Sequence, residues 1–184
     1  MSRKEREEVY EFIKKQLRKE YIRPSKSPRM APVFFVEKKD GKKRMVQDYR
    51  YLNKWMVKNN YPLPLILDII KNIGTKKVFT KIDLRWGYNN MRIKEENKWK
   101  AAFTMSKGSF EPMVMFFGLT NSPATFQTMM NELLRDLIVI GKVVVFINDI
   151  IIETEDKEEH DKLVREVVKR LEENNLYVKP EKCK

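Results

Sequence analysis

The chain has 184 residues, of which 42% are hydrophobic and 35% are charged, and its formal net charge at pH 7 is +12. This length can bury a core in one domain or two lobes. The pI near 9.6 points to a polyanionic partner, with nucleic acid favoured over an anionic membrane, although a Lys-rich surface also serves plain solubility. The single cysteine, Cys183, excludes an internal disulfide and fits a reducing, intracellular compartment.

The start of the chain is basic and Glu-rich, and it lacks the apolar core of a secretory signal. No apolar run approaches the roughly 18 residues of a membrane span, so none is expected. Residues 2–20 are instead predicted to form a helix, with Ser2 and Glu5 as a capping box. Apolar side chains recur there at helical spacing and predict one packing face: Val9, Phe12, Ile13 and Leu17.

Residues 31–50 are predicted to form a hairpin. One strand covers residues 32–36, Asp40-Gly41 is a strong turn signal, and the return strand runs from about Arg44 to Tyr49. Basic residues crowd this turn, including Lys38. Such a cluster is either a solvated loop tip or a grip for phosphate.

Residues 51–75 are predicted to be mostly loop and short helix, because Pro62 and Pro64 restrict the backbone. Residues 77–83 form a predicted strand that ends in Asp83. Gly108 marks a turn between strands around 99–105 and 110–115. Ser122-Pro123 then opens a helix, with the serine as its N-cap. That helix has one apolar face: Phe126, Met129, Met130, Leu133, Leu134 and Leu137.

Residues 143–152 carry a polar pair, Asn148 and Asp149, between two apolar runs. Strands this apolar favour burial on both faces, and a carboxylate between them needs compensation. Either a tight surface turn or a metal ion would supply it.

The last predicted helix covers residues 157–174, with inward-facing apolar residues: Leu163, Val167, Val168 and Leu171. His160 lies on it among acidic residues, and we interpret it as part of a solvated face rather than as a catalytic base. Residues 177–178 form a predicted edge strand. This order of elements favours an α+β fold, an antiparallel sheet backed by helices.

Asp83 and Asp149 each lie at the end of a predicted strand. If the strands are adjacent, the two carboxylates can converge on one or two magnesium ions, since hard divalent metals prefer oxygen ligands. Two such ions would clamp the attacking and leaving oxygens in nucleotidyl transfer. A single aspartate at a strand end is more often a cap or turn residue, so this pair alone leaves the choice open.

From Tyr21 to Lys184 the chain resembles the fingers and palm of reverse transcriptases, most closely those of gypsy-type LTR retrotransposons. Several motifs occur in the family's order and spacing: IRPSKSP at 22–28, KKDG at 38–41, RMVQDYRYLNK at 44–54, YPLP at 61–64, FTKIDLRWGY at 79–88, FGLTNSPATFQ at 117–127 and KC at 182–183. Each motif alone is weak, but the ordered set is specific.

The resemblance implies a polymerase right-hand fold, with fingers at about 1–78 and 95–117 and palm at about 79–94 and 118–184. It implies an RNA-directed DNA polymerase, a nucleotidyltransferase that binds an RNA or DNA template with a DNA primer, and dNTP. The cofactor would be two Mg²⁺ ions, with Mn²⁺ as an option. The location would be a cytoplasmic retroelement particle.

The resemblance also assigns roles to residues of the metal and phosphate site. Asp83 would bind both metals and the backbone carbonyl of Leu84 would contact one. The backbone amides of Trp86 and Gly87 would receive the triphosphate. Lys38 and Arg44 would neutralise its charge.

Further residues would shape the nucleotide pocket and touch nucleic acid. Tyr88 would be a steric gate against the ribose 2′-OH, although it could instead be a plain core aromatic. Gly118 would let the backbone approach the nucleotide, if it is not an ordinary turn glycine. Phe117 would border the same pocket. Contacts to nucleic acid are expected from three residues: Phe146, Ile147 and Asn53.

The chain departs from the family at the hairpin tip, where aromatic-x-Asp-Asp becomes Phe146-Ile147-Asn148-Asp149. Asn148 keeps the shape and one oxygen acceptor but loses the charge, which by analogy costs about 3–4 kcal/mol in the barrier. Hairpin alternation is expected to point the side chain of Asp149 elsewhere. Phe146 also lacks the hydroxyl of the tyrosine often found there.

The sequence ends at Lys184, where the family continues into a primer-gripping hairpin and a thumb, so a polyprotein fragment is expected. Two alternatives stay open. One is a catalytically inactive nucleic-acid-binding module derived from a reverse transcriptase, and the other is a structural or assembly piece.

Overall fold

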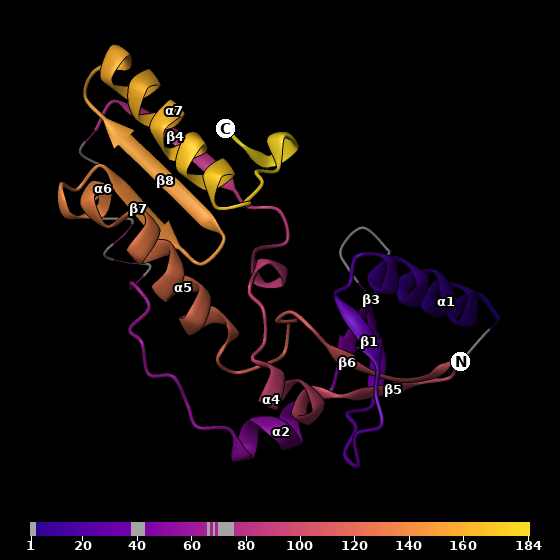
Figure 1. Cartoon of the computed structure of the whole chain (residues 1–184). Coiled ribbons are helices and arrows are strands. Elements are labelled where there is room, and N and C mark those ends of the chain that lie inside the picture. The colour runs from indigo at the N-terminus through magenta and orange to yellow at the C-terminus, as the bar shows by residue number, and fades with distance from the viewer. Residues whose placement is uncertain (1–2, 38–42, 66, 68, 70–75) are drawn as a thin grey trace. The chain divides into compact units, whose positions relative to one another are not determined.

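The computed structural model describes residues 3–37, 43–65, 67, 69 and 76–184. The chain divides into two compact units: unit 1 is Met1–Lys58 with Met91–Ser122, and unit 2 is Asn59–Asn90 with Pro123–Lys184. Each unit packs helices against antiparallel strands, which confirms the predicted α+β class (Figure 1). The described part of the chain contains no helix long and apolar enough to cross a membrane.

Unit 1 holds a three-stranded sheet and a two-stranded hairpin. Its elements are α1 (Arg3–Arg18), β1 (Ile22–Pro24), β2 (Val33–Glu37), β3 (Lys43–Gln47), α2 (Arg50–Trp55), α4 (Glu95–Lys98), η2 (Trp99–Ala101), β5 (Phe103–Met105) and β6 (Gly108–Pro112). The sheet order is β1-β6-β5, and β2 pairs with β3.

Helix α1 forms where predicted and buries Val9 and Ile13, which lie one turn apart. They join a core with strand residues such as Ile22 and Phe103. One expectation was wrong, because Leu17 is exposed and Gln16 is buried in its place. The predicted capping box lies outside the described residues, since Ser2 and the side chain of Glu5 are not described.

The hairpin of β2 and β3 confirms the predicted pairing, with Val33 opposite Gln47 and Val36 opposite Arg44. Its predicted Asp40-Gly41 turn and Lys38 lie outside the described residues, and so does the side chain of Arg44.

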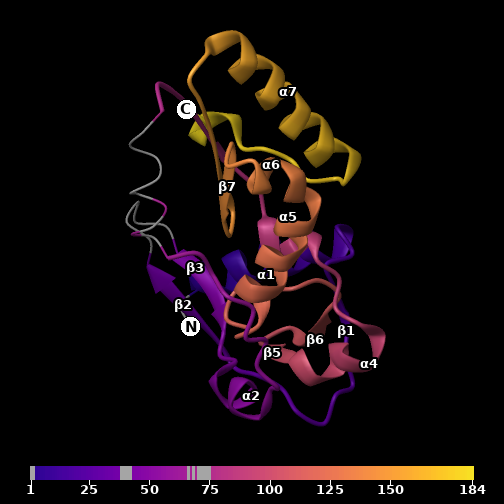
Figure 2. The same ribbon diagram turned by 90° about the vertical axis from the view of Figure 1, so that its left-hand side faces the viewer.

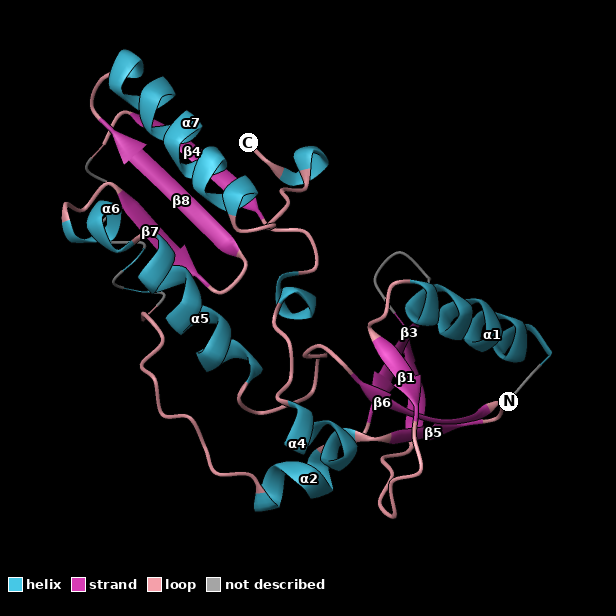
Figure 3. Ribbon diagram, in the orientation of Figure 1, coloured by secondary structure: helices cyan, strands magenta, loops and turns pink. Residues whose placement is uncertain are grey.

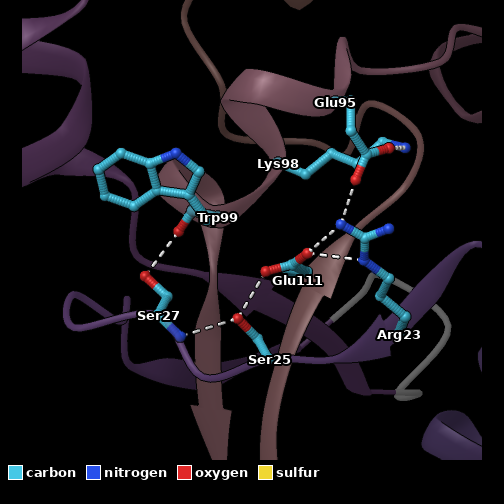
Figure 4. Close-up of polar contacts among 7 residues, drawn as sticks. All are labelled: Arg23, Ser25, Ser27, Glu95, Lys98, Trp99 and Glu111. Atoms are coloured by element: carbon cyan, nitrogen blue, oxygen red, sulfur yellow. Dashed lines mark hydrogen bonds and ion pairs between the residues drawn. The ribbon is translucent and has the colours of Figure 1, made fainter.

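A polar network ties the segment after α1 to β6 and α4 (Figure 4). The Arg23 guanidinium donates to the carboxylates of Glu95 and Glu111, with 2.7 Å between its Nε and Oε1 of Glu111. Ser25 donates to the other oxygen of Glu111 at 2.6 Å. The buried carboxylate of Glu111 is therefore compensated, which removes most of its desolvation cost.

Unit 2 holds a three-stranded antiparallel sheet of order β4-β8-β7 (Figure 3). Its elements are β4 (Val78–Asp83), η1 (Gly87–Asn90), α5 (Ser122–Leu133, whose first residue belongs to unit 1), α6 (Arg135–Val139), β7 (Val143–Phe146), β8 (Asp149–Thr154), α7 (Lys157–Glu173) and η3 (Pro180–Lys182). Val178 makes one antiparallel bridge to Leu84, in place of a longer edge strand.

The helices of unit 2 cover one face of this sheet. Alternate residues Ile150 and Ile152 of β8 are fully buried, as are Val167 and Leu171 of α7, which packs on β8 and β4. Helix α6 packs beside β7 (Figure 2). The alternation of buried strand residues follows the period of two that the sequence shows.

Two local expectations for helices α5 and α7 were wrong. His160 is not solvated but buried, with Nε2 2.7 Å from Thr80 Oγ1 and Nδ1 3.0 Å from Thr154 Oγ1. Its acidic sequence neighbours lie on the outer face of α7, and the ring itself points toward the sheet. Ser122 is the first residue of α5 rather than the residue before it, and its hydroxyl donates to the carbonyl of Phe116.

Candidate active site

The two strand-end carboxylates are direct partners in the sheet of unit 2. The register pairs Asp83, the last residue of β4, with Asp149, the first residue of β8, and pairs Asp149 with Phe146 of β7. Residues directly opposite in an antiparallel pair share a face and lie close together. We expected hairpin alternation to point Asp149 away, and this was wrong. Asn148 lies in the turn, so the alternation of β8 begins at Asp149.

Each carboxylate has a lysine beside it. Lys81 Nζ lies 3.0 Å from Asp149 Oδ1, and Lys182 Nζ lies 3.5 Å from Asp83 Oδ2. These side chains are all partly exposed, so each pair stabilises the fold by well under about 1 kcal/mol. The lysines do keep positive charge at the sheet end where the two carboxylates meet.

The side chain of Gln127 in α5 is fully buried and makes two hydrogen bonds to the backbone of the hairpin tip. Its Nε2 donates to the Val145 carbonyl at 2.9 Å, and its Oε1 accepts from the Ile147 amide at 2.8 Å. Ile147 has a φ of 54°, which is unfavourable for a β-branched residue and persists only where surrounding contacts impose it. Gln127 therefore fixes the turn that carries Asn148.

The same glutamine belongs to a longer polar chain. Its Nε2 also donates to Asn131 Oδ1 at 2.8 Å, and Asn131 Nδ2 donates to the Tyr61 hydroxyl at 2.8 Å. Four hydrogen bonds thus link Tyr61 to the hairpin tip. Buried networks of this kind orient their members closely when every member is satisfied.

Asn148 packs against Gly87 in the segment that follows β4. Its backbone carbonyl accepts from the Leu84 amide at 2.9 Å, which extends the β4–β8 ladder by one step. A Cβ added at Gly87 would lie 2.0 Å from Asn148 Oδ1, so any larger residue there would require the Asn148 side chain to move. The Oδ1 atom is buried and has no hydrogen-bond partner, which makes it the unexplained polar atom of the tip.

The residues around Gly87 adopt an unusual backbone. Trp86 has a φ of 63°, and its carbonyl accepts from the Asn89 amide at 2.8 Å as η1 begins. Tyr88 is buried, and its ring lies edge-on to that of Phe126 with 5.9 Å between the ring centroids. Burial raises the pKa of the Tyr88 phenol. The tight turn places Trp86, Gly87 and Tyr88 at the same sheet end as Asp83.

Five predicted site residues lie in unit 1, and the structure describes the side chains of three of them. Gly118 has a φ of 97°, and a Cβ there would lie 3.3 Å from the Gln47 carbonyl oxygen, so this loop requires glycine. Asn53 holds the loop, because its Nδ2 donates to the Gly118 carbonyl at 2.7 Å and its Oδ1 accepts from Thr120. Phe117 is half exposed. Arg44 is described only by its backbone in β3, and Lys38 lies outside the described residues.

The donor atoms at the hairpin end suit a hard divalent cation. Two carboxylates belong to residues directly opposite each other in the sheet, and one amide oxygen, Asn148 Oδ1, is buried without a hydrogen-bond partner. Among the described residues there is no cluster of three or more Asp, Glu, His or Cys side chains that could hold a metal. The residue types present, two carboxylates and one neutral amide oxygen, are ones that a hard divalent cation accepts as ligands.

Sequence reasoning missed Gln127, Lys81 and Lys182. Lys81 sits two residues before Asp83 on the same strand face, a spacing that was available as a signal. Gln127 was visible only as a polar residue within an apolar helix. Nothing local indicated that it reaches the turn at Ile147, 20 residues later.

Comparisons with known proteins agree on one family. The family described as "Reverse transcriptase (RNA-dependent DNA polymerase)" matches residues 36–184. The chain is 39% identical over 171 residues to the transposon Tf2-3 polyprotein of Schizosaccharomyces pombe and 38% identical to the Tf2-7 polyprotein. Both matches cover 93% of this chain and 13% of the polyprotein, so the chain spans a small part of these relatives.

Solved structures show the same similarity. The foamy viral protease-reverse transcriptase in complex with an RNA/DNA hybrid matches with a TM-score of 0.91 and 28% identity, over 100% of this chain and 24% of that one. The same viral protein in complex with dsDNA matches with a TM-score of 0.87 and 30% identity, over 95% of this chain and 36% of that one.

Proposed function

This chain belongs to the reverse transcriptase family, a family of nucleotidyltransferases, and we propose that it is the fingers and palm part of an RNA-directed DNA polymerase. Unit 1 would supply most of the fingers and unit 2 most of the palm. The observation that carries the proposal is the direct pairing of Asp83 with Asp149, beside the Asn148 turn. The match to Tf2 polyproteins further supports a gypsy-type retrotransposon polyprotein as its source.

Reverse transcriptases generally use divalent metals, and Asp83 and Asp149 would hold two Mg²⁺ ions here, with the Leu84 carbonyl as a further ligand. The bound metals would neutralise the charge that develops on the phosphates during nucleotidyl transfer. Asp149 would keep its position through its register with Asp83, and Gln127 would hold the turn between β7 and β8. Mn²⁺ could replace Mg²⁺, because both are hard ions that take oxygen ligands.

The nucleotide would lie over the turn after β4. Backbone amides at Trp86 and Gly87 would bind the triphosphate, as exposed N–H groups in tight turns do. The ring of Tyr88, fixed against Phe126, would exclude a ribose 2′-OH. Four residues of unit 1 are further proposed nucleotide-binding residues of the fingers: Lys38, Arg44, Phe117 and Gly118.

The template–primer would occupy the exposed surface near the hairpin tip. Phe146 and Ile147 would contact it from the palm, and Asn53 would act through the loop at Gly118 that it holds. The related viral enzyme was solved with an RNA/DNA hybrid and with dsDNA, which supports both template classes. The basic net charge suits such a partner. The location would be a cytoplasmic retroelement particle.

Asn148 would impair the reaction. An amide oxygen carries no net charge, so it offsets the positive charge of the metal ions less than a carboxylate at the same place would. The expected loss is about 10²–10³-fold in rate.

Primer extension by this chain with dNTP and Mg²⁺ or Mn²⁺, beside its Asp83→Ala variant, tests the assigned site. We expect slow extension that depends on metal and is abolished by Asp83→Ala. Extension at the same rate in the variant would refute the site. An exposed carboxylate far from the tip, Asp161, provides the matched control as Asp161→Ala.

One observation favours a second function. The buried, neutral Asn148 Oδ1 would suit a module that binds nucleic acid without performing chemistry. Such a module would bind template–primer with strong salt dependence but would never extend it, even as the Asn148→Asp variant.

A further inference from the structure

Tyr61 in unit 2 has a side chain that reaches helix α5. Its hydroxyl accepts a hydrogen bond from Asn131 Nδ2 at 2.8 Å. Asn131 Oδ1 accepts from Gln127 Nε2 at 2.8 Å, and Gln127 Oε1 accepts from the Ile147 amide at 2.8 Å. Three hydrogen bonds in series therefore connect the backbone of the hairpin tip with Tyr61. We call these three side chains and the Ile147 amide the Tyr61 network.

The direction of each bond in the Tyr61 network follows from the one before it. A backbone N–H can only donate, so the Ile147 amide requires the side-chain oxygen of Gln127 beside it. Both hydrogens on Gln127 Nε2 are then engaged, by Asn131 Oδ1 and by the Val145 carbonyl. Asn131 must therefore present its nitrogen to the hydroxyl oxygen of Tyr61. Rotating either side-chain amide by 180° would set donor against donor, so the network has one arrangement.

The Tyr61 network runs from a buried side chain to partly exposed ones. Gln127 is fully buried, whereas Asn131 and Tyr61 are partly exposed. Without the Tyr61 hydroxyl, Asn131 could turn away from Gln127. One hydrogen on Gln127 Nε2 would then lack an acceptor in a buried place, which is unfavourable. The hydroxyl at the outer end thus affects how firmly Gln127 is held at the inner end.

The segment that carries Tyr61 has a second attachment to α5. The Tyr61 amide donates to Asn59 Oδ1 at 3.1 Å, and Asn59 Nδ2 donates to Thr125 Oγ1 at 3.5 Å. Asn59 thus holds the backbone of this segment, whereas the Tyr61 hydroxyl joins the network that ends at the hairpin tip. The two contacts can be removed one at a time.

The hairpin tip needs support of this kind because its backbone is strained. Ile147 has a φ of 54°, which a β-branched residue rarely adopts and which persists only where surrounding contacts impose it. The next residues are Asn148 and Asp149, and Asp149 is the sheet partner of Asp83. Any relaxation of the turn would shift the side chains that follow it.

We propose that Tyr61 is a positioning residue for the candidate active site. Its hydroxyl acts through Asn131 and Gln127 to hold the strained turn that carries Asn148. Tyr61 itself touches neither metal nor nucleotide. The effect on reaction rate rests on the proposed function, whereas the effect on the turn does not. The competing explanation is that Tyr61 only fastens its own segment to α5.

Backbone amide hydrogen exchange of the full chain, followed by NMR, tests the proposal without any need for catalysis. Tyr61→Phe keeps the ring and removes only the hydroxyl. The Ile147 amide should exchange roughly tenfold faster in this variant, because its acceptor Gln127 is held less firmly. The amide of Leu171, a fully buried residue of α7, should exchange at its unaltered rate.

Matched variants separate the network from the segment that carries it. Asn131→Ala interrupts the network one step closer to the tip and should speed exchange at Ile147 at least as much. Adding Tyr61→Phe to Asn131→Ala should then change nothing more, because the hydroxyl acts only through Asn131. Asn59→Ala loosens the segment but keeps the network, so the Ile147 amide should stay protected. Tyr10→Phe removes an exposed hydroxyl of unit 1 and should have no effect.

Primer extension connects the turn to the reaction. A displaced tip misplaces the reacting groups, so Tyr61→Phe should lower kcat roughly tenfold. The KM for dNTP should stay the same, because Tyr61 does not bind the nucleotide. A purely structural role would lower only the folded fraction, so kcat per folded molecule would be unchanged. Circular dichroism measures that fraction.

Three results would overturn the proposal. The first is an unchanged exchange rate at Ile147 in Tyr61→Phe, and the second is an equal acceleration in Asn59→Ala. The third is faster exchange at Ile147 with an unaltered kcat, because Tyr61 would then hold the turn without positioning the site. If the unaltered chain extends no primer at all, the proposed function fails, and hydrogen exchange still decides whether Tyr61 holds the turn.

Discussion

At the scale of single residues, the hairpin tip depends on side chains that contribute no chemistry. Gln127 accepts a hydrogen bond from the Ile147 amide in a strained turn, and Gly87 leaves space for the Asn148 side-chain amide. Asn148 itself carries an unsatisfied buried oxygen. The acidic residue of the pair, Asp149, has the regular position of a strand partner. The tip is thus built to hold one particular turn conformation.

Replacing Gln127 with alanine should destabilise the fold by about 3 kcal/mol. The change leaves the Ile147 amide and the Val145 carbonyl without their partner in a buried site, at about 1–3 kcal/mol each. Urea unfolding measures the loss. Glu132→Ala on the exposed side of the same helix serves as the control and should cost less than about 0.5 kcal/mol. Equal midpoints for both variants would mean that Gln127 does not support the turn.

Replacing Gly87 with alanine should displace the tip, since the new Cβ would lie 2.0 Å from Asn148 Oδ1. Overpacking of this kind costs about 1–3 kcal/mol. Gly141→Ala is the matched control, because its φ of 70° strains alanine but nothing lies within 4 Å of the added carbon. A shift in the backbone amide NMR signals of Ile147 and Asn148 should appear only in Gly87→Ala. Unchanged tip signals would contradict the close contact.

At the scale of elements, contacts distant in sequence lock the helices of unit 2 onto its sheet. His160 joins α7 to β4 and β8 through two threonine hydroxyls. Arg170 of α7 binds Asp136 of α6 with two hydrogen bonds, at 2.5 and 2.8 Å, and also binds Glu166. These contacts set how α6 and α7 sit together.

The α6–α7 contact should weaken in acid. Hydrogen bonds from Arg170 lower the pKa of Asp136 from 3.8 to about 2 in the folded chain. A lowered folded pKa means that this stability is present above about pH 4 and is lost as pH falls toward 2. The difference in unfolding midpoint between the unaltered chain and Asp136→Asn should therefore shrink between pH 5 and pH 2. Asp161→Asn makes the same charge change on α7 without that partner. A difference that stays constant with pH would rule out the ion pair as its cause.

The elements themselves were largely predictable, whereas the links between them were not. The 143–152 hairpin and helix α1 follow from local periodicity, and the structure confirms both. Burial of His160 and of Gln16 depends on which face meets a distant strand, which local pattern does not encode. The side-chain direction of Asp149 was predicted wrongly, because it depends on which residue ends the turn and begins strand β8.

At the scale of the whole chain, family membership and fold rest on agreement between motif order and structure. The motifs from residue 22 to residue 183 include short segments, such as Ser25 and Ser27, whose side chains hold polar networks rather than substrates. The resemblance alone could not separate these structural positions from site positions. The structure separates them, because the hydroxyls of Ser25 and Ser27 already donate hydrogen bonds to other parts of unit 1.

We propose that the hairpin end of unit 2 is a metal site for nucleotidyl transfer and that the neutral Asn148 limits its activity. Metal-dependent primer extension by the Asn148→Asp variant, measured beside the unaltered chain, tests it most directly. Restoring the carboxylate should raise the extension rate by roughly 10²–10³-fold, and adding Asp83→Ala should abolish the gain. An Asn148→Asp variant that extends primers no faster than the unaltered chain would contradict it.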